Sequence, residues 1–161
     1  MAPKRNYVDA TKFLRSIENA PTEVRQEVED LTIEMANLGA QRVRRYILTR
    51  GTNKTWKGGW WSKKSQRYRY GSLSARVDSG DMLDSVGTQI QAGQKQSRAA
   101  FGWIKNYEPY FGYQDQGFYN VRAGVDVPGM FALRDARRDV VRETPKLARK
   151  YEKRIVRRLG T

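Results

Sequence analysis

The sequence predicts an α+β fold in which a long N-terminal helix and a long C-terminal helix pack on one face of a small antiparallel sheet. Apolar residues recur at helical spacing before residue 50 and again after residue 130. Two runs between them, residues 86–91 and 98–104, have the composition and length of strands. The 161 residues are 39% hydrophobic and 30% charged, which suits a single core. We therefore expect an N-terminal arm over residues 1–19 and one α+β domain over residues 20–161.

The first helix is expected to run from the sequence NAPT at residues 19–22 to about Arg50. Proline and threonine are typical of a first helical turn, and Gly51 is a typical stop. Acidic residues fill its first half and arginines its second half, which complements the helix dipole. Its apolar stripe is expected to consist of Val24, Val28, Leu31, Met35, Leu38, Val43, Tyr46 and Ile47.

Short elements are expected in the middle of the chain. Residues 77–85 (VDSGDMLDS) predict a helical turn whose free N–H groups Asp78 or Ser79 would cap. The two strands are expected to be joined across residues 92–97, followed by an aromatic loop at 107–119 and a short third strand within 121–127.

The second long helix is expected to start at residues 127–129 (VPG), with Pro145 kinking or splitting it. From Met130 to Thr161 the chain carries eleven basic and four acidic residues, an excess that indicates an acidic or nucleic partner nearby. Its apolar face is expected to consist of Phe131, Leu133, Ala136, Val140, Leu147, Tyr151, Ile155 and Leu159.

The composition argues against several classes of function. Cysteine and histidine are absent, which excludes disulfides, Cys/His zinc sites and an imidazole base. The aspartates at 78, 81 and 84 do not match a calcium loop and are interpreted as caps and surface. We expect no enzyme, no cofactor, no metal and no membrane partner. The N-terminal residues lack a secretory h-region, so a cytoplasmic origin is expected, and the net charge of +14 favours polyanionic partners.

The basic aromatic segment, residues 51–77, is the most unusual part of the sequence. From Arg50 to Val77 there are eight basic residues and no acidic one, while Gly58, Gly59 and Gly71 favour a turn-rich loop or hairpin. Three interpretations remain open: a protein interface, a nucleic-acid contact, or rings that pin the loop to the sheet. The candidate docking or DNA-contact residues are Trp56, Lys57, Trp60, Trp61, Lys63, Lys64, Arg67, Tyr68, Arg69 and Tyr70.

Three short motifs, in order, resemble the neck and tail-completion proteins of tailed bacteriophages. SGDMLDSV at 79–86 is similar to a signature of Ser or Thr, Gly, any residue, Leu, two variable residues, Ser, and Ile or Val, with Met82 at the position of the Leu. YFGYQDQG at 110–117 is similar to a tyrosine-rich loop of that family, and GMFALRDA at 129–136 to the start of its C-terminal helix. The motif positions are Ser79, Gly80, Met82, Ser85, Val86, Tyr110, Tyr113, Gly117, Phe131 and Leu133.

The resemblance implies a non-enzymatic virion protein that forms a ring, commonly sixfold, at the neck or the top of the tail. Such a ring joins tail to head and lets DNA pass. Its partners would be other copies of itself, a head-connector or head-completion protein, the tail tube protein and, without sequence preference, phage DNA. The long segment at 51–77 is not part of the resemblance, and any role for it is separate. The alternative is a stand-alone basic nucleic-acid-binding protein.

Overall fold

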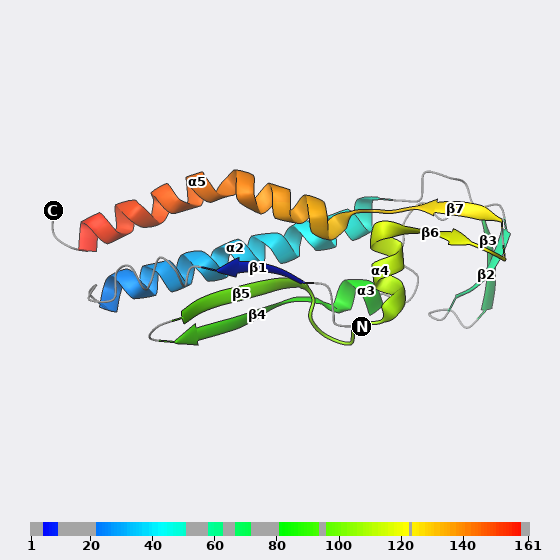
Figure 1. Cartoon of the computed structure of the whole chain (residues 1–161), viewed down its shortest axis with the longest axis horizontal. Coiled ribbons are helices and arrows are strands. Elements are labelled where there is room, and N and C mark those ends of the chain that lie inside the picture. The colour runs from blue at the N-terminus through cyan, green and yellow to red at the C-terminus, as the bar shows by residue number, and fades with distance from the viewer. Residues whose placement is uncertain are drawn as a thin grey trace.

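Two long helices form the length of the molecule. The computed structural model describes residues 5–9, 22–50, 58–62, 67–71, 81–93, 96–122 and 124–158. Figure 1 shows helix α2 (Thr22–Thr49) beside helix α5 (Ala132–Arg158), running in opposite directions along an elongated molecule. The α+β class and both long helices predicted from the sequence are confirmed.

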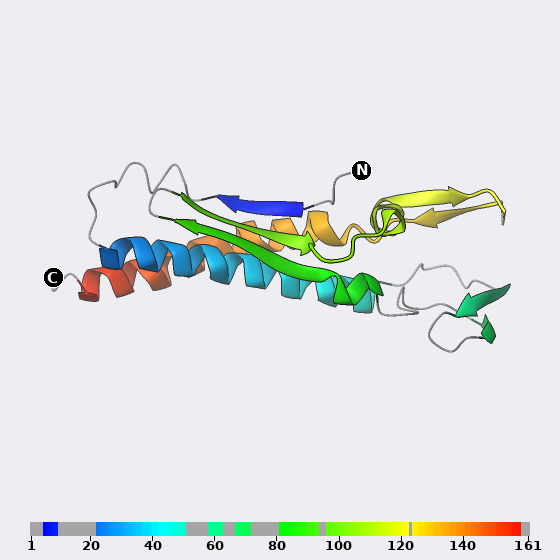
Figure 2. The same cartoon turned by 90° about the horizontal axis from the view of Figure 1, so that it is seen from below.

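A three-stranded antiparallel sheet packs against α2. Its order is β1 (Arg5–Asp9), β5 (Gln96–Trp103), β4 (Val86–Gly93), so β5 is the central strand. Figure 2 shows all three strands on one side of the helix pair, with α2 in contact with them. Residues 5–9 of the expected N-terminal arm therefore belong to the sheet, where they pair with the central strand; residues 10–21 lie outside the described part of the chain.

The core lies between α2, the sheet and the first turns of α5. Phe101 and Trp103 of β5 are fully buried against Val43 and Ile47 of α2. Gly39 makes this contact possible, because a Cβ atom built on it would lie 2.6 Å from the Phe101 ring. Burying rings of this size stabilises the fold by about 2–3 kcal/mol each.

The aromatic loop expected at residues 107–119 is instead helix α4 (Pro109–Gln116) followed by strand β6 (Gly117–Asn120). Proline is favoured at a first helical position, and Pro109 occupies it. Phe111 anchors the helix, since its buried ring lies 5.8 Å from Trp103 and 6.0 Å from Tyr107, centroid to centroid. Packing of Phe111 against the core stabilises a helix here, and local sequence propensity does not predict that contact.

The short third strand expected over residues 121–127 is confirmed over residues 125–127 only. β6 pairs with β7 (Val125–Pro128) in a hairpin, and residues 121, 122 and 124 belong to the turn between them. The predicted helical turn is α3 (Asp81–Asp84), while its expected caps Asp78 and Ser79 lie outside the described residues. β4 and β5 are longer than predicted, which leaves a shorter connection between them.

Helix α5 begins at Ala132 and continues through Pro145 without a break. Figure 1 shows it bent near the middle of its length, where Pro145 falls in the sequence. Of the two expected effects of Pro145, the helix therefore shows a kink and is not split. Of its expected apolar face, Phe131 is 37% exposed, because it precedes the helix and lies outside the interface with α2.

Opposite charges join α2 and α5 along their length. Arg50 at the end of α2 pairs with Asp135 at 2.7 Å, and Glu27 near its start lies 2.9 Å from Arg158. The antiparallel arrangement brings the acidic half of α2 beside the basic half of α5. The charge asymmetry attributed above to the helix dipole therefore also matches the two helices to each other.

Candidate interaction surface

The basic aromatic segment contains a β-hairpin at one end of the molecule. β2 (Gly58–Ser62) and β3 (Arg67–Gly71) are antiparallel, and the backbone register pairs Trp60 with Arg69 and Trp61 with Tyr68. Figures 1 and 2 both place this hairpin at the same end as β6–β7. A hairpin is one of the two forms expected for residues 51–77. Trp56, Lys57, Lys63 and Lys64 lie outside the described residues.

The first family motif is part of the core. Met82 and Val86 are buried, and the buried Ser85 hydroxyl donates a hydrogen bond of 2.9 Å to the carbonyl of Met82. The carbonyl of Ser85 in turn accepts hydrogen bonds from the N–H groups of Ile104 and Lys105 at 2.9 and 3.2 Å. Ser85 directly follows α3, and its hydrogen bonds connect α3 to the residues after β5, so its role is structural. Ser79 and Gly80 lie outside the described residues.

The second and third motifs are hydrogen-bonded to each other. A buried carboxylate oxygen of Asp115 accepts a hydrogen bond of 2.5 Å from the N–H of Ala132, the first residue of α5. The carbonyl oxygen of Asp115 accepts a second, of 2.8 Å, from the N–H of Phe131. The carboxylate thereby satisfies a donor that the helix leaves without an internal partner. Asp115 was absent from the predicted residues; its place two residues before Gly117 was the available signal.

Two glycines allow the segments to approach this closely. Gly117 has φ of 89°, and a Cβ atom on it would lie 2.8 Å from the backbone nitrogen of Gly129. A Cβ atom on Gly129 would lie 2.5 Å from the carbonyl carbon of Gln116. Neither position has room for a larger residue. The end of α4 and the start of α5 are therefore in direct backbone contact.

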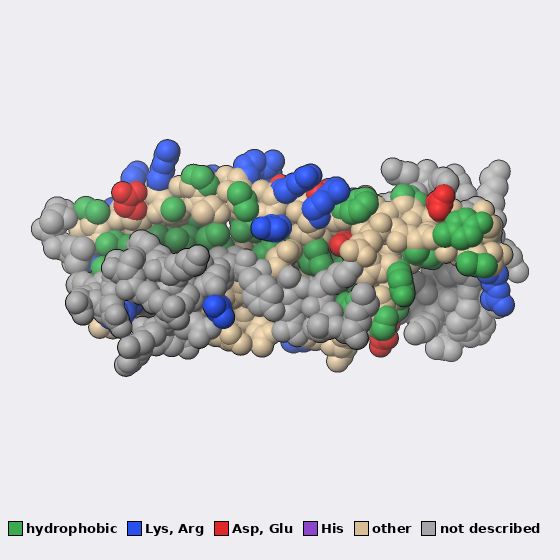
Figure 3. Space-filling model, in the orientation of Figure 1, with side chains coloured by type: hydrophobic (Ala, Val, Ile, Leu, Met, Phe, Trp, Pro, Cys, Tyr) green, Lys and Arg blue, Asp and Glu red, His purple; other side chains and the backbone are tan. Residues whose placement is uncertain are grey.

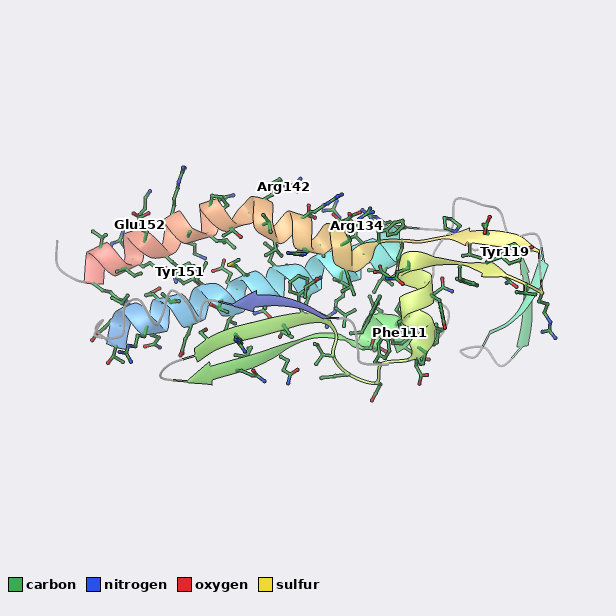
Figure 4. The ribbon with its side chains drawn as sticks, in the orientation of Figure 1. Phe111, Tyr119, Arg134, Arg142, Tyr151 and Glu152 are labelled. Carbon is green, nitrogen blue, oxygen red and sulfur yellow. The ribbon has the colours of Figure 1, made fainter. Side chains whose placement is uncertain are left out.

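The aromatic end, which we define as α4, the β6–β7 hairpin and Phe131, carries apolar side chains that the core does not use. Tyr113 is 59% exposed and Tyr119 58%. Figure 3 shows apolar side chains gathered over this end of the molecule, and Figure 4 shows Tyr119 on the hairpin, away from the helix pair. The exposed set is Tyr110, Tyr113, Tyr119, Val121 and Phe131.

Phe131 is held in a backbone conformation that side chains rarely adopt, with φ of 52°. Its N–H bonds to Asp115, and its carbonyl accepts from Asp135 at 3.0 Å. The guanidinium of Arg134 lies 4.2 Å from the centre of its ring. Such strain is worth about 1–3 kcal/mol and persists only where the surroundings fix it. Here it leaves an aromatic ring partly exposed beside the hairpin.

Arg50 connects the end of α2 to the same region. It donates to the carbonyl of Met130 at 2.5 Å and to Asp135 at 2.7 Å, and its guanidinium lies 3.9 Å from the ring centre of Tyr46. Hydrogen bonds from Arg134 and from Arg50 hold the pKa of the Asp135 carboxyl below its ordinary value. The start of α5 is therefore fixed from both α4 and α2.

The other end of the helix interface contains a buried tyrosine. The Tyr151 hydroxyl donates a hydrogen bond of 2.7 Å to Glu34, which also accepts from Lys150 at 2.8 Å. Burial, together with the Glu34 carboxylate, raises the pKa of Tyr151 to about 12. The hydrogen bonds from Lys150 and Tyr151 hold the pKa of Glu34 below its ordinary value. This contact fastens the far half of α5 to α2.

Among the described residues, no three or more acidic side chains gather in a group that could hold a metal ion. A shallow groove between α2 and α5, lined among others by Asp30, Ile33 and Leu147, is a surface feature of the helix pair. No helix in the described part of the chain is long and apolar enough to cross a membrane. Comparisons of the sequence with protein-family models and curated proteins, and of the fold with solved structures, gave no match.

Proposed function

We propose that this chain is a structural subunit of a tailed-phage virion, forming a ring of about six copies at the neck or the top of the tail. The ring joins tail to head and lets DNA pass. The observation that carries the proposal is the convergence of the three motifs in one packed unit. Met82, Val86, Phe111, Met130, Leu133 and Ala136 belong to a single buried cluster. The three matched segments thus pack together in the core, which supports the resemblance.

The exposed residues of the second motif support a docking role. Tyr110 and Tyr113 lie on α4, where Phe111 alone supplies the buried ring of that helix. Tyrosine is enriched at protein interfaces because its ring is apolar and its hydroxyl tolerates water. We assign the aromatic end to the contact with the adjacent layer, a head-connector protein or the tail tube protein.

The sheet offers a route to a closed ring. Among the described residues no further strand pairs with β1 or with β4, so in the described part of the chain these two strands are the edges of the sheet, on opposite sides of β5. Open edges readily pair with a strand of another chain. Pairing of one edge with the other edge of a neighbour is a head-to-tail contact, which gives a ring when the rotation closes.

Ile90 of β4 gives a direct test, because it is an apolar side chain that is 45% exposed on an edge strand. A lysine there disfavours edge pairing. Sedimentation velocity in high salt should show that Ile90→Lys converts the assembled protein to a folded monomer. The matched control is Val141→Lys, which places the same charge at a 63% exposed apolar residue of α5 and should leave assembly unchanged. Assembly of the Ile90 variant as in the wild type would exclude this edge.

The β2–β3 hairpin is the second proposed docking element. Joint replacement of Trp60, Trp61, Arg67 and Arg69 by alanine should leave a folded protein that no longer supports head–tail joining in an infected host. Tailed particles in normal yield from such a mutant would remove the hairpin from the interface. The alternative, a stand-alone nucleic-acid-binding protein, instead predicts loss of DNA affinity from the same change.

A further inference from the structure

The basic residues of α5 divide into two sets. The first set forms ion pairs: Arg134 and Arg138 with Asp135, Arg142 with Asp139, Lys150 with Glu34, and Arg154 and Arg158 with Glu27. The second set is exposed and has no ion pair or hydrogen bond to any residue that the structure describes: Arg137, Lys146, Arg149, Lys153 and Arg157. The last four are close together in the second half of the helix, and we name them the cationic stripe; Arg137 lies about two and a half turns before Lys146 and is not part of it.

The stripe lies along one face of the helix. Its members are three, four and four residues apart, the spacing of neighbours on a helical surface. At 1.5 Å per residue they form a row roughly 16 Å long. Two shallow hollows of the surface are lined by these residues together with their neighbours on α5 alone. Figure 3 shows Lys and Arg side chains along this edge of the molecule, and Figure 4 shows Tyr151 turned inward toward α2.

Like charges at these spacings repel each other, so the stripe favours a bound polyanion. A protein interface of ordinary strength has an apolar or aromatic centre that loses its water. Of the residues that line the two hollows, only Pro145 and Val156 are apolar, and neither is aromatic. Base stacking also needs aromatic rings, and no exposed residue of α5 supplies one. What remains is the contact of a row of cations with a regular row of phosphates.

We propose that the cationic stripe of α5 binds the phosphodiester backbone of duplex nucleic acid without reading its bases. The site is distinct from the β2–β3 hairpin, which lies beyond the other end of α5 (Figure 1). The inference goes beyond the ring and does not depend on it, because it concerns a surface of the single chain.

The test is fluorescence anisotropy with a labelled duplex of mixed sequence, about 30 base pairs long, over a series of salt concentrations. The stripe variant is Arg149→Gln, Lys153→Gln and Arg157→Gln. The control variant, Arg45→Gln, Lys105→Gln and Arg122→Gln, removes the same charge from exposed residues outside α5. Glutamine preserves helix propensity at the helical positions, and all six residues are exposed, so both variants should remain folded.

The stripe variant should bind at least about tenfold more weakly at low salt, and its slope of log affinity against log salt should fall by about 2 to 3. The control variant should stay within about threefold of the wild type at every salt concentration. An equal loss of duplex affinity in both variants would show that only the net charge of the protein matters, and would overturn the proposal. Absence of duplex binding by the wild type at low salt would overturn it as well. Repeating the titration with poly-glutamate distinguishes nucleic acid from an acidic protein surface as the partner. If the wild type binds poly-glutamate more tightly than the duplex, and the stripe variant loses that affinity, the partner is an acidic protein and the proposal is wrong.

Discussion

The carboxylate of Asp115 and the backbone N–H of Ala132 form a hydrogen bond of 2.5 Å that fixes the first turn of α5 to the end of α4. We expect Asp115→Ala to lower the free energy of unfolding by about 1–2 kcal/mol, since it removes a buried acceptor from a helix start. Asp115→Asn, which keeps an acceptor oxygen, should lose less. Urea denaturation measures both. Asp126→Ala, at an exposed residue of β7, is the control, and an equal loss there would contradict the capping role.

Gly117 and Gly129 should tolerate no side chain. Alanine at either position should lower the free energy of unfolding by about 2 kcal/mol or more, because its Cβ atom would meet backbone atoms at 2.5–2.9 Å. Gly87→Ala is the matched control, since its nearest neighbour would lie 3.9 Å away, an ordinary contact. Thermal unfolding of the three variants compares them. Similar melting temperatures for all three would show that the two segments separate easily.

Gly39→Ala should reverse the usual effect of this substitution. In a helix interior alanine is normally more stable than glycine by about 1 kcal/mol. Here the added methyl group would lie 2.6 Å from the Phe101 ring, so we expect a loss of about 1–3 kcal/mol instead. Phe101→Leu combined with Gly39→Ala should recover part of that loss in urea denaturation. A stabilised single variant would mean that the ring moves aside freely.

Tyr151 predicts a pH dependence at the basic end of the range. Its pKa is raised from 10.0 to about 12, so the unfolded chain releases this proton at lower pH than the native chain. The raised pKa contributes on the order of 2 kcal/mol to the free energy of unfolding. This contribution is fully present below pH 10 and is lost as the pH rises toward 12. Urea denaturation at intervals between about pH 9 and pH 11.5 should show this fall in the wild type. For Tyr151→Phe the free energy of unfolding should fall less over the same pH range. Parallel curves for the two proteins would show that the Tyr151 hydroxyl does not cause the fall.

The periodic parts of the chain could be predicted from the sequence, and the closely packed end could not. Both long helices, the central strand pair and the hairpin at Gly58–Gly71 follow from apolar spacing and glycine placement. Helix α4 and the β6–β7 hairpin do not, because the structure there depends on Phe111 entering the core and on Asp115 reaching Ala132. Contacts between distant segments leave no local pattern.

The candidate site shows the same division. Among the motif residues, Met82, Ser85, Val86 and Leu133 are buried, while Tyr113 is exposed. The sequence could not separate the two roles, because a motif match does not say which side chains face water. Likewise, the basic excess after residue 130 was visible in the sequence, but its division into paired and unpaired cations depends on aspartates of α5 itself and on Glu27 and Glu34 of α2.

The central claim, that the chain assembles into a closed ring, is tested most directly by negative-stain microscopy of the purified protein in high salt, with mass photometry across a concentration series. High salt removes bound polyanions that would mimic assembly. We expect rings of uniform size, with a mass corresponding to about six copies of the 18.6 kDa chain. A monomer at every concentration, or open chains that never close, would contradict the account.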